Sequence, residues 1–181
     1  MSSVIPAVTP RRDGEPEVDL TAVRLVHRAM LTDVRALADL ADRVAGGTTT
    51  PGNDPRAALR RYADRLCAEI SSLNDAESEE LWPVVAASAG SAVDLSDLAD
   101  DHHAIDPVLA RCRTALAALT VAADDRETAA QLAGAMTDLL ALVEEHVAET
   151  ERVLFPAVRA FVSVTDYDNA QARMRRRDAL G

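Results

Sequence analysis

Residues 95–116 read LSDLADDHHAIDPVLARCRTAL, and this stretch decides the fold that the sequence predicts. Its apolar positions recur at spacings of three and four residues, which is the pattern of one buried face of an α-helix. Pro107 lies inside the pattern and is expected to kink the helix. The stretch therefore predicts a long amphipathic helix whose buried face consists of Leu95, Leu98, His102, Ile105, Leu109, Cys112 and Leu116.

Three more stretches, residues 20–45, 55–90 and 126–161, show the same spacing. Asp19 can cap the first of these helices, because a carboxylate oxygen accepts hydrogen bonds from free backbone N–H groups at a helix start. Pro156 is expected to kink the last one. The sequence thus predicts four long amphipathic helices.

Four such helices joined by short loops predict an all-α fold, an up-down-up-down four-helix bundle. We expect the bundle to occupy residues 19–162. A flexible N-terminal tail, residues 1–18, is expected before it, and a C-terminal tail or short helix, residues 163–181, after it.

Composition excludes several classes of function. The chain has 181 residues and a net charge of −11, and all 19 of its basic residues are arginines. No broad basic face is expected, so nucleic acid is not expected as a partner. No apolar run suits a signal peptide or a membrane span, which predicts a cytoplasmic protein without membrane contact. Cys67 and Cys112 fall in helical patterns and are interpreted as reduced core residues.

Four polar residues interrupt the apolar stripes, one in each predicted helix: His27, Glu77, His102 and His146. In an antiparallel bundle the first three fall at similar heights, and the height of His146 depends on where its helix ends. Burying titratable groups without partners is costly, so they need a hydrogen-bond network or a cation. We interpret them as metal ligands. His103 is rotated by about 100° from His102 on the helix and is not expected to share the site.

These residues also carry a resemblance. Glu77 precedes Leu81-Trp82-Pro83, His146 precedes Leu154-Phe155-Pro156, and His27 and His102 lie in the other two helices. Over about residues 19–161 this pattern resembles the haemerythrin-like, HHE cation-binding family. The resemblance implies a non-haem iron centre, with one or two ions. It also implies a small ligand such as oxygen, peroxide or nitric oxide.

The chain departs from the family pattern at two positions. Leu73 stands four residues before Glu77, where the family has a histidine, and Thr150 stands four residues after His146, where it has a glutamate. Glu149 and Glu151 flank Thr150, and both remain candidate ligands: an ideal helix favours Glu149, and a local bulge would favour Glu151. The ligand atoms of such a site are enough for one metal ion but too few to coordinate two ions well.

Two further interpretations stay open. The bundle could have lost its metal, keep a hydrogen-bonded polar layer, and act as a small-molecule-binding or protein-interaction module. A core cavity beside Leu73 could instead accept an organic ligand. Whether the chain is an enzyme is left open; peroxide disproportionation or oxygen activation would be the chemistry of an iron site with free positions.

Overall fold

The computed structural model describes residues 6–47, 55–119 and 126–178, and these residues form helices without any strand. The predicted all-α class is confirmed. A single isolated bridge joins Pro10 to Val162. In chain order the elements are α1 (Thr21–Ala45), α2 (Pro55–Ala76), η1 (Glu77–Leu81), α3 (Trp82–Ala89), η2 (Gly90–Ala92), α4 (Ser96–Ala118), α5 (Arg126–Glu149), η3 (Thr150–Leu154), α6 (Phe155–Phe161) and α7 (Val164–Asp178).

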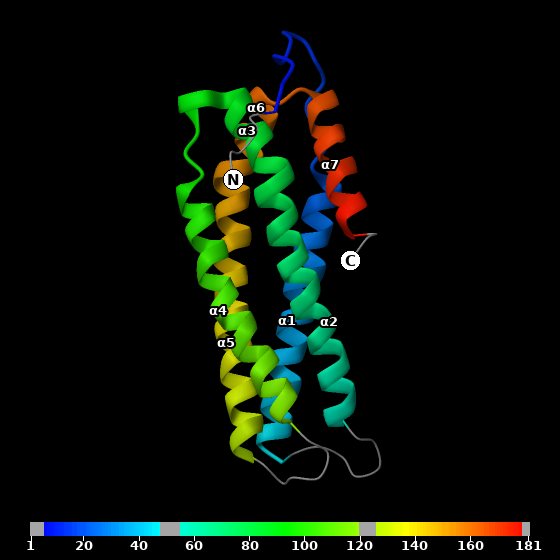
Figure 1. The fold of residues 1–181 in the computed structure, drawn as a ribbon, viewed down its shortest axis with the longest axis vertical. Helices are drawn as coiled ribbons and strands as arrows, with labels where there is room; N and C mark the ends of the chain where they lie inside the picture. The colour runs from blue at the N-terminus through cyan, green and yellow to red at the C-terminus, as the bar shows by residue number, and fades with distance from the viewer. Residues whose placement is uncertain (1–5, 48–54, 120–125, 179–181) are drawn as a thin grey trace.

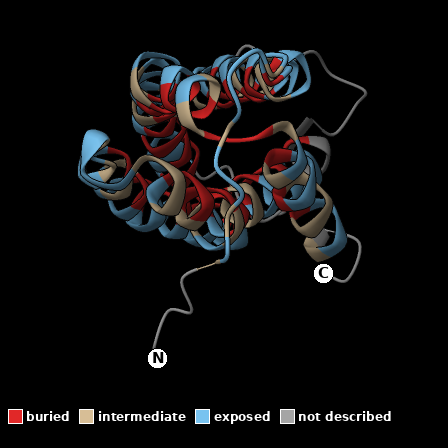
Figure 2. Ribbon diagram, turned by 90° about the horizontal axis from the view of Figure 1, so that it is seen from above, coloured by how far each residue is buried: buried red, intermediate tan, exposed pale blue. Residues whose placement is uncertain are grey.

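The long helices α1, α2, α4 and α5 lie side by side along the long axis of the molecule (Figure 1). Each packs against two others: α5 against α1 and α4, and α2 against α1 and α4. Their buried faces point inward, as the view along the bundle shows (Figure 2). The apolar core this creates includes both free cysteines, Cys67 and Cys112, which are fully buried. α4 continues through Pro107 as one helix.

Two short π-helical segments, η1 and η3, interrupt the helices that start with α2 and α5. In each, a backbone N–H bonds the carbonyl five residues earlier: Trp82 bonds Glu77, and Phe155 bonds Thr150. A proline follows each of these aromatic residues, and proline lacks the N–H that a regular helix would use. Each segment inserts the equivalent of one extra residue, which rotates everything after it around the helix axis.

The N-terminal segment lies against the start of helix α7, to which it is joined by hydrogen bonds between Thr9 and Asp166 and between Glu15 and Val164. Residues 6–20 run across one end of the bundle, and Asp19 Oδ1 accepts a hydrogen bond of 2.9 Å from Thr21 N at the start of α1. Val18 and Leu20 are buried. The C-terminal stretch, for which a tail or short helix was expected, contains the 15-residue helix α7, which packs on η1.

None of the described helices is both long enough and apolar enough to cross a membrane.

Candidate metal centre

Glu77, the first residue of η1, lies at the centre of a cluster with three histidines, one each from α1, α4 and α5. Its Oε1 is 3.5 Å from His27 Nε2, and its Oε2 is 3.4 Å from both His102 Nε2 and His146 Nε2. The exposed fractions of His27, Glu77, His102 and His146 are 1%, 1%, 7% and 2%. The structure therefore brings together the four polar residues that the stripes singled out.

Aromatic rings fix the imidazoles in place. The Trp82 ring stacks on His102 with 4.4 Å between centroids, and the Phe155 ring lies parallel to His27 at 6.2 Å. The His102 and His146 rings are 4.6 Å apart. Trp82 and Phe155 are the aromatic residues of the two Leu-aromatic-Pro sequences, so the turns that follow η1 and η3 supply walls of the cluster.

Two further polar residues contact the outer nitrogens of the imidazoles. Ser78 Oγ forms a hydrogen bond of 3.0 Å with His102 Nδ1, and Asp101 Oδ2 lies 3.7 Å from His146 Nδ1. Burial raises the pKa of Asp101, although the His146 charge works against this. A hydrogen-bond partner on Nδ1, as Ser78 is for His102, holds an imidazole in the tautomer and orientation that leave Nε2 free to bind a metal. Asp101 Oδ2 and His146 Nδ1 lie at ion-pair distance without a hydrogen bond.

The charge balance of the cluster favours an ionised carboxylate. Burial alone would raise the pKa of Glu77, but the imidazoles of His102, His146 and His27 outweigh it and hold this pKa well below its ordinary value. Both carboxylate oxygens and the Nε2 atoms of all three histidines are buried without a hydrogen bond of normal geometry. Buried polar atoms of this kind need a partner, and an ion between them would provide it.

The spacing of these atoms suits a transition metal. With metal–ligand bonds of about 2.0–2.2 Å, neighbouring ligand atoms are about 3.0 Å apart in an octahedral site and about 3.4 Å apart in a tetrahedral one. Glu77 Oε2 lies 3.4 Å from both His102 Nε2 and His146 Nε2, which matches the tetrahedral spacing, and one ligand atom from each of the three residues lies within 4.8 Å of the others. Imidazole nitrogens with a carboxylate are donors that iron, zinc, copper and nickel accept. The residues present therefore fit a bound metal ion.

The two candidate glutamates that follow His146 are not brought into this cluster. Glu149 pairs with Arg152, and Glu151 Oε1 lies 3.9 Å from Arg24 Nε at the surface. Between them Thr150 takes the inward position and is fully buried. Glu149 and Glu151 lie on either side of the helix face that Thr150 occupies. Both carboxylates therefore lie outside the core.

Sequence reasoning missed Asn74, Ser78 and Asp101. Asn74 is buried. Spacings of four and three join Ile70, Asn74 and Glu77 in one stripe, and this signal could have found it. Asp101 follows Asp100 in the sequence, and only the packing of α4 on α5 brings its Oδ2 within 3.7 Å of His146 Nδ1. His103 is exposed, as its rotation on the helix predicted.

Fold and site together define a helical-bundle protein with a buried histidine–carboxylate cluster. The family model described as Hemerythrin HHE cation binding domain matches residues 18–158, which is most of the chain. The chain belongs to this family. Comparisons with curated proteins and with solved structures gave no significant match.

Proposed function

We propose that this protein binds one iron ion in the bundle core and uses the remaining coordination positions for a small ligand such as oxygen, peroxide or nitric oxide. The observation that carries the proposal is the placement of His102 Nε2 and His146 Nε2 at 3.4 Å from Glu77 Oε2. Two histidines and one carboxylate with open positions are the typical ligand set of non-haem iron(II). His27 faces the other oxygen of Glu77 and is a fourth candidate donor.

The side chains around the cluster favour one ion rather than two. Leu73 is half-buried and offers no donor atom, and Thr150 offers a hydroxyl where a second carboxylate would be needed. Glu149 and Glu151 are held by arginines. Each ion of a two-metal site needs several protein ligands, and the described residues supply one set.

The chain's own residues have separate tasks in this proposal. Glu77, His102 and His146 hold the ion; Ser78 and Asp101 orient the two imidazoles. Trp82 and Phe155 exclude water from two sides. When bound, the metal would supply the electrons and the binding position for a diatomic ligand or peroxide.

The test is elemental analysis of protein purified without a nickel column, alongside an absorption spectrum. We expect about one iron per chain in the wild type, loss of most of it in His146→Ala, and retention in His103→Ala, whose side chain is exposed. Nitric oxide should bind reversibly to the iron-loaded protein. Equal losses from both variants would refute the ligand assignment, and two irons per chain would refute the one-ion site. No metal after anaerobic loading with iron(II) would favour the metal-free bundle as a small-molecule-binding or protein-interaction module.

We also infer that the four long helices run up-down-up-down. Support comes from the closed ring of packing, in which α1 contacts α2, α2 contacts α4, α4 contacts α5 and α5 contacts α1. Short connections between consecutive helices favour antiparallel neighbours. A cytoplasmic location and the absence of nucleic-acid binding remain predictions from the sequence.

A further inference from the structure

Helix α7 lies directly against the segment that carries the central carboxylate. Arg173 Nε donates a hydrogen bond of 2.5 Å to Glu80 Oε2, and an Arg173 terminal nitrogen lies 3.4 Å from the Glu80 backbone carbonyl. One turn further along, Arg177 pairs with Glu79. Two arginines of one helix thus hold two consecutive acidic residues of η1, the segment whose first residue is Glu77.

Apolar packing fixes the same contact from within. Tyr167, Ala170 and Met174 are buried on the inner face of α7, in one apolar cluster with Leu81 and Trp82. Trp82 in turn stacks on His102. A continuous set of contacts therefore joins α7 to the end of η1 and to one wall of the cluster.

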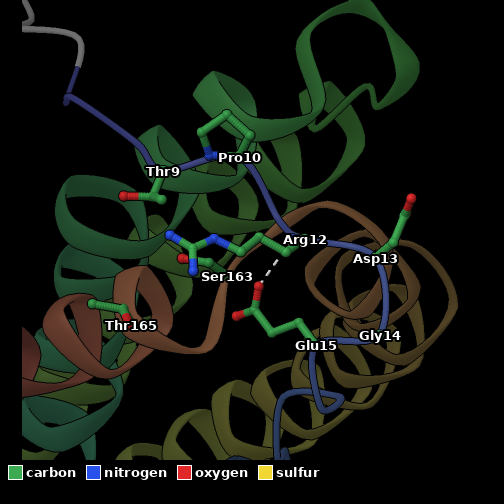
Figure 3. Close-up of a pocket in the computed structure, with 8 residues that line it drawn as sticks. All are labelled: Thr9, Pro10, Arg12, Asp13, Gly14, Glu15, Ser163 and Thr165. Carbon is green, nitrogen blue, oxygen red and sulfur yellow. Dashed lines mark hydrogen bonds between the residues drawn. The ribbon is translucent and has the colours of Figure 1, made fainter.

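The beginning of α7 is anchored to a different part of the chain. Val164 N donates a hydrogen bond of 2.8 Å to Glu15 Oε1, and Thr9 N donates one of 2.7 Å to Asp166 Oδ2. Figure 3 shows Glu15 and Thr9 on the N-terminal segment beside Ser163 and Thr165, around one surface hollow. Because α7 is held at its start by this segment, its arginines are presented to η1 in a defined position.

A π-helical segment needs such support more than a regular helix does. Its wider turn makes poorer packing across the helix axis, and these segments occur mostly where a site requires a particular side-chain direction. A carboxylate that must face three imidazoles tolerates little rotation of its backbone. The contact between Arg173 and the Glu80 carbonyl acts on that backbone three residues after Glu77.

We propose that α7 is a clamp that fixes the direction of Glu77, and that Arg173 is a positioning residue of the metal centre. The clamp rests on the proposed function for its effect on metal binding. Arg173 touches neither the cluster nor an ion, and it acts through Glu80 and the backbone of η1. α7 begins after residue 158, where the family match ends.

The first test uses the metal-free protein and therefore does not depend on metal binding. Nitrogen-15 NMR signals of the imidazoles of His27, His102 and His146 report where the Glu77 carboxylate lies. Arg173→Ala should shift these signals, while Arg176→Ala, which removes an exposed arginine of the same helix, should leave them in place. Unchanged imidazole signals in a folded Arg173→Ala variant would overturn the clamp even if the protein binds metal.

The second test uses the protein loaded with cobalt(II), whose visible absorption reports coordination geometry, and measures metal release to a chelator. Arg173→Ala should alter the spectrum and release the metal about tenfold faster, the lower end of the effect of residues that orient metal ligands. Arg173→Lys keeps the charge opposite Glu80 and should recover part of the loss. A variant that only lowers the unfolding temperature, with wild-type spectrum and release rate, would show a purely structural role. A wild type that binds no metal would refute the proposed function, while the imidazole signals still decide the position of Glu77.

Discussion

The segments η1 and η3 follow α2 and α5, and each ends on the leucine of a Leu-aromatic-Pro sequence. Their first residues differ in chemistry. Glu77 opens η1 with a buried carboxylate that faces three imidazoles, whereas Thr150 opens η3 with a buried hydroxyl that has no hydrogen-bond partner among the described residues. The residues four positions earlier differ in the opposite sense, because Leu73 precedes Glu77 and His146 precedes Thr150.

This comparison shows that two segments can share the same π-helical backbone while each supplies a different candidate ligand. The α2 side retains the carboxylate and the α5 side retains the histidine, so together they supply one histidine–glutamate pair across the bundle. The ion pairs around the two segments also differ. Glu79 and Glu80 of η1 pair with arginines of α7, while Glu151 of η3 lies near Arg24 at the surface. We infer that the backbone around the charged ligand is held more firmly than its counterpart.

The largest expected effect is on the side of η1. Glu77→Gln keeps the shape of the side chain but removes the charge that the three histidines face, so iron affinity should fall on the order of 100-fold or more, about 2.7 kcal/mol. The measurement is competition with a chelator under anaerobic conditions. Glu151→Gln is the matched control on η3 and should change the affinity by less than about threefold, since Glu151 faces solvent and Arg24. A loss in Glu151→Gln as large as that in Glu77→Gln would mean that η3 supplies a ligand and that the comparison fails.

A smaller effect is expected at the histidine that pairs with η3. Asp101 of α4 contacts His146 Nδ1, so Asp101→Asn weakens the orientation of this imidazole without touching its metal-facing nitrogen. Iron affinity should fall about tenfold, or about 1.4 kcal/mol. Asp100→Asn, at the exposed neighbouring position, should leave the affinity unchanged. Identical affinities in the two variants would show that packing alone orients His146.

The sequence predicted the helical class and the cluster for a physical reason. His27, Glu77, His102 and His146 stand at stripe positions, and a stripe position identifies a buried residue without knowledge of its partners. It was harder to predict which of the residues that follow His146 faces the core. Helix geometry was used to choose between Glu149 and Glu151 as a ligand, but the residue that faces the core is Thr150, which lies between them.

Features that depend on contacts between distant segments left no trace in the periodicity. Asp101 has its neighbour Asp100 in an exposed position, and only the approach of α5 distinguishes the two. The C-terminal stretch was expected to be a tail or short helix, yet its Arg173 and Arg177 reach η1 across almost a hundred residues of chain. Such pairs are set by tertiary packing, and the periodicity of the sequence does not reveal which charged residues will meet.

The smallest expected effect concerns Thr150 and sharpens the contrast between the two segments. Its Oγ1 is buried without a partner among the described residues, and a buried hydroxyl left unpaired costs about 1–3 kcal/mol. Thr150→Val replaces the hydroxyl by a methyl group of similar size, so the metal-free protein should gain about 1 kcal/mol in its free energy of unfolding, measured by urea denaturation. Thr128→Val is the control at a buried threonine that does have an interaction partner, and it should lose stability. A destabilised Thr150→Val variant would instead show that the hydroxyl is hydrogen-bonded in solution, and η3 would then contribute a polar group to the centre as η1 does.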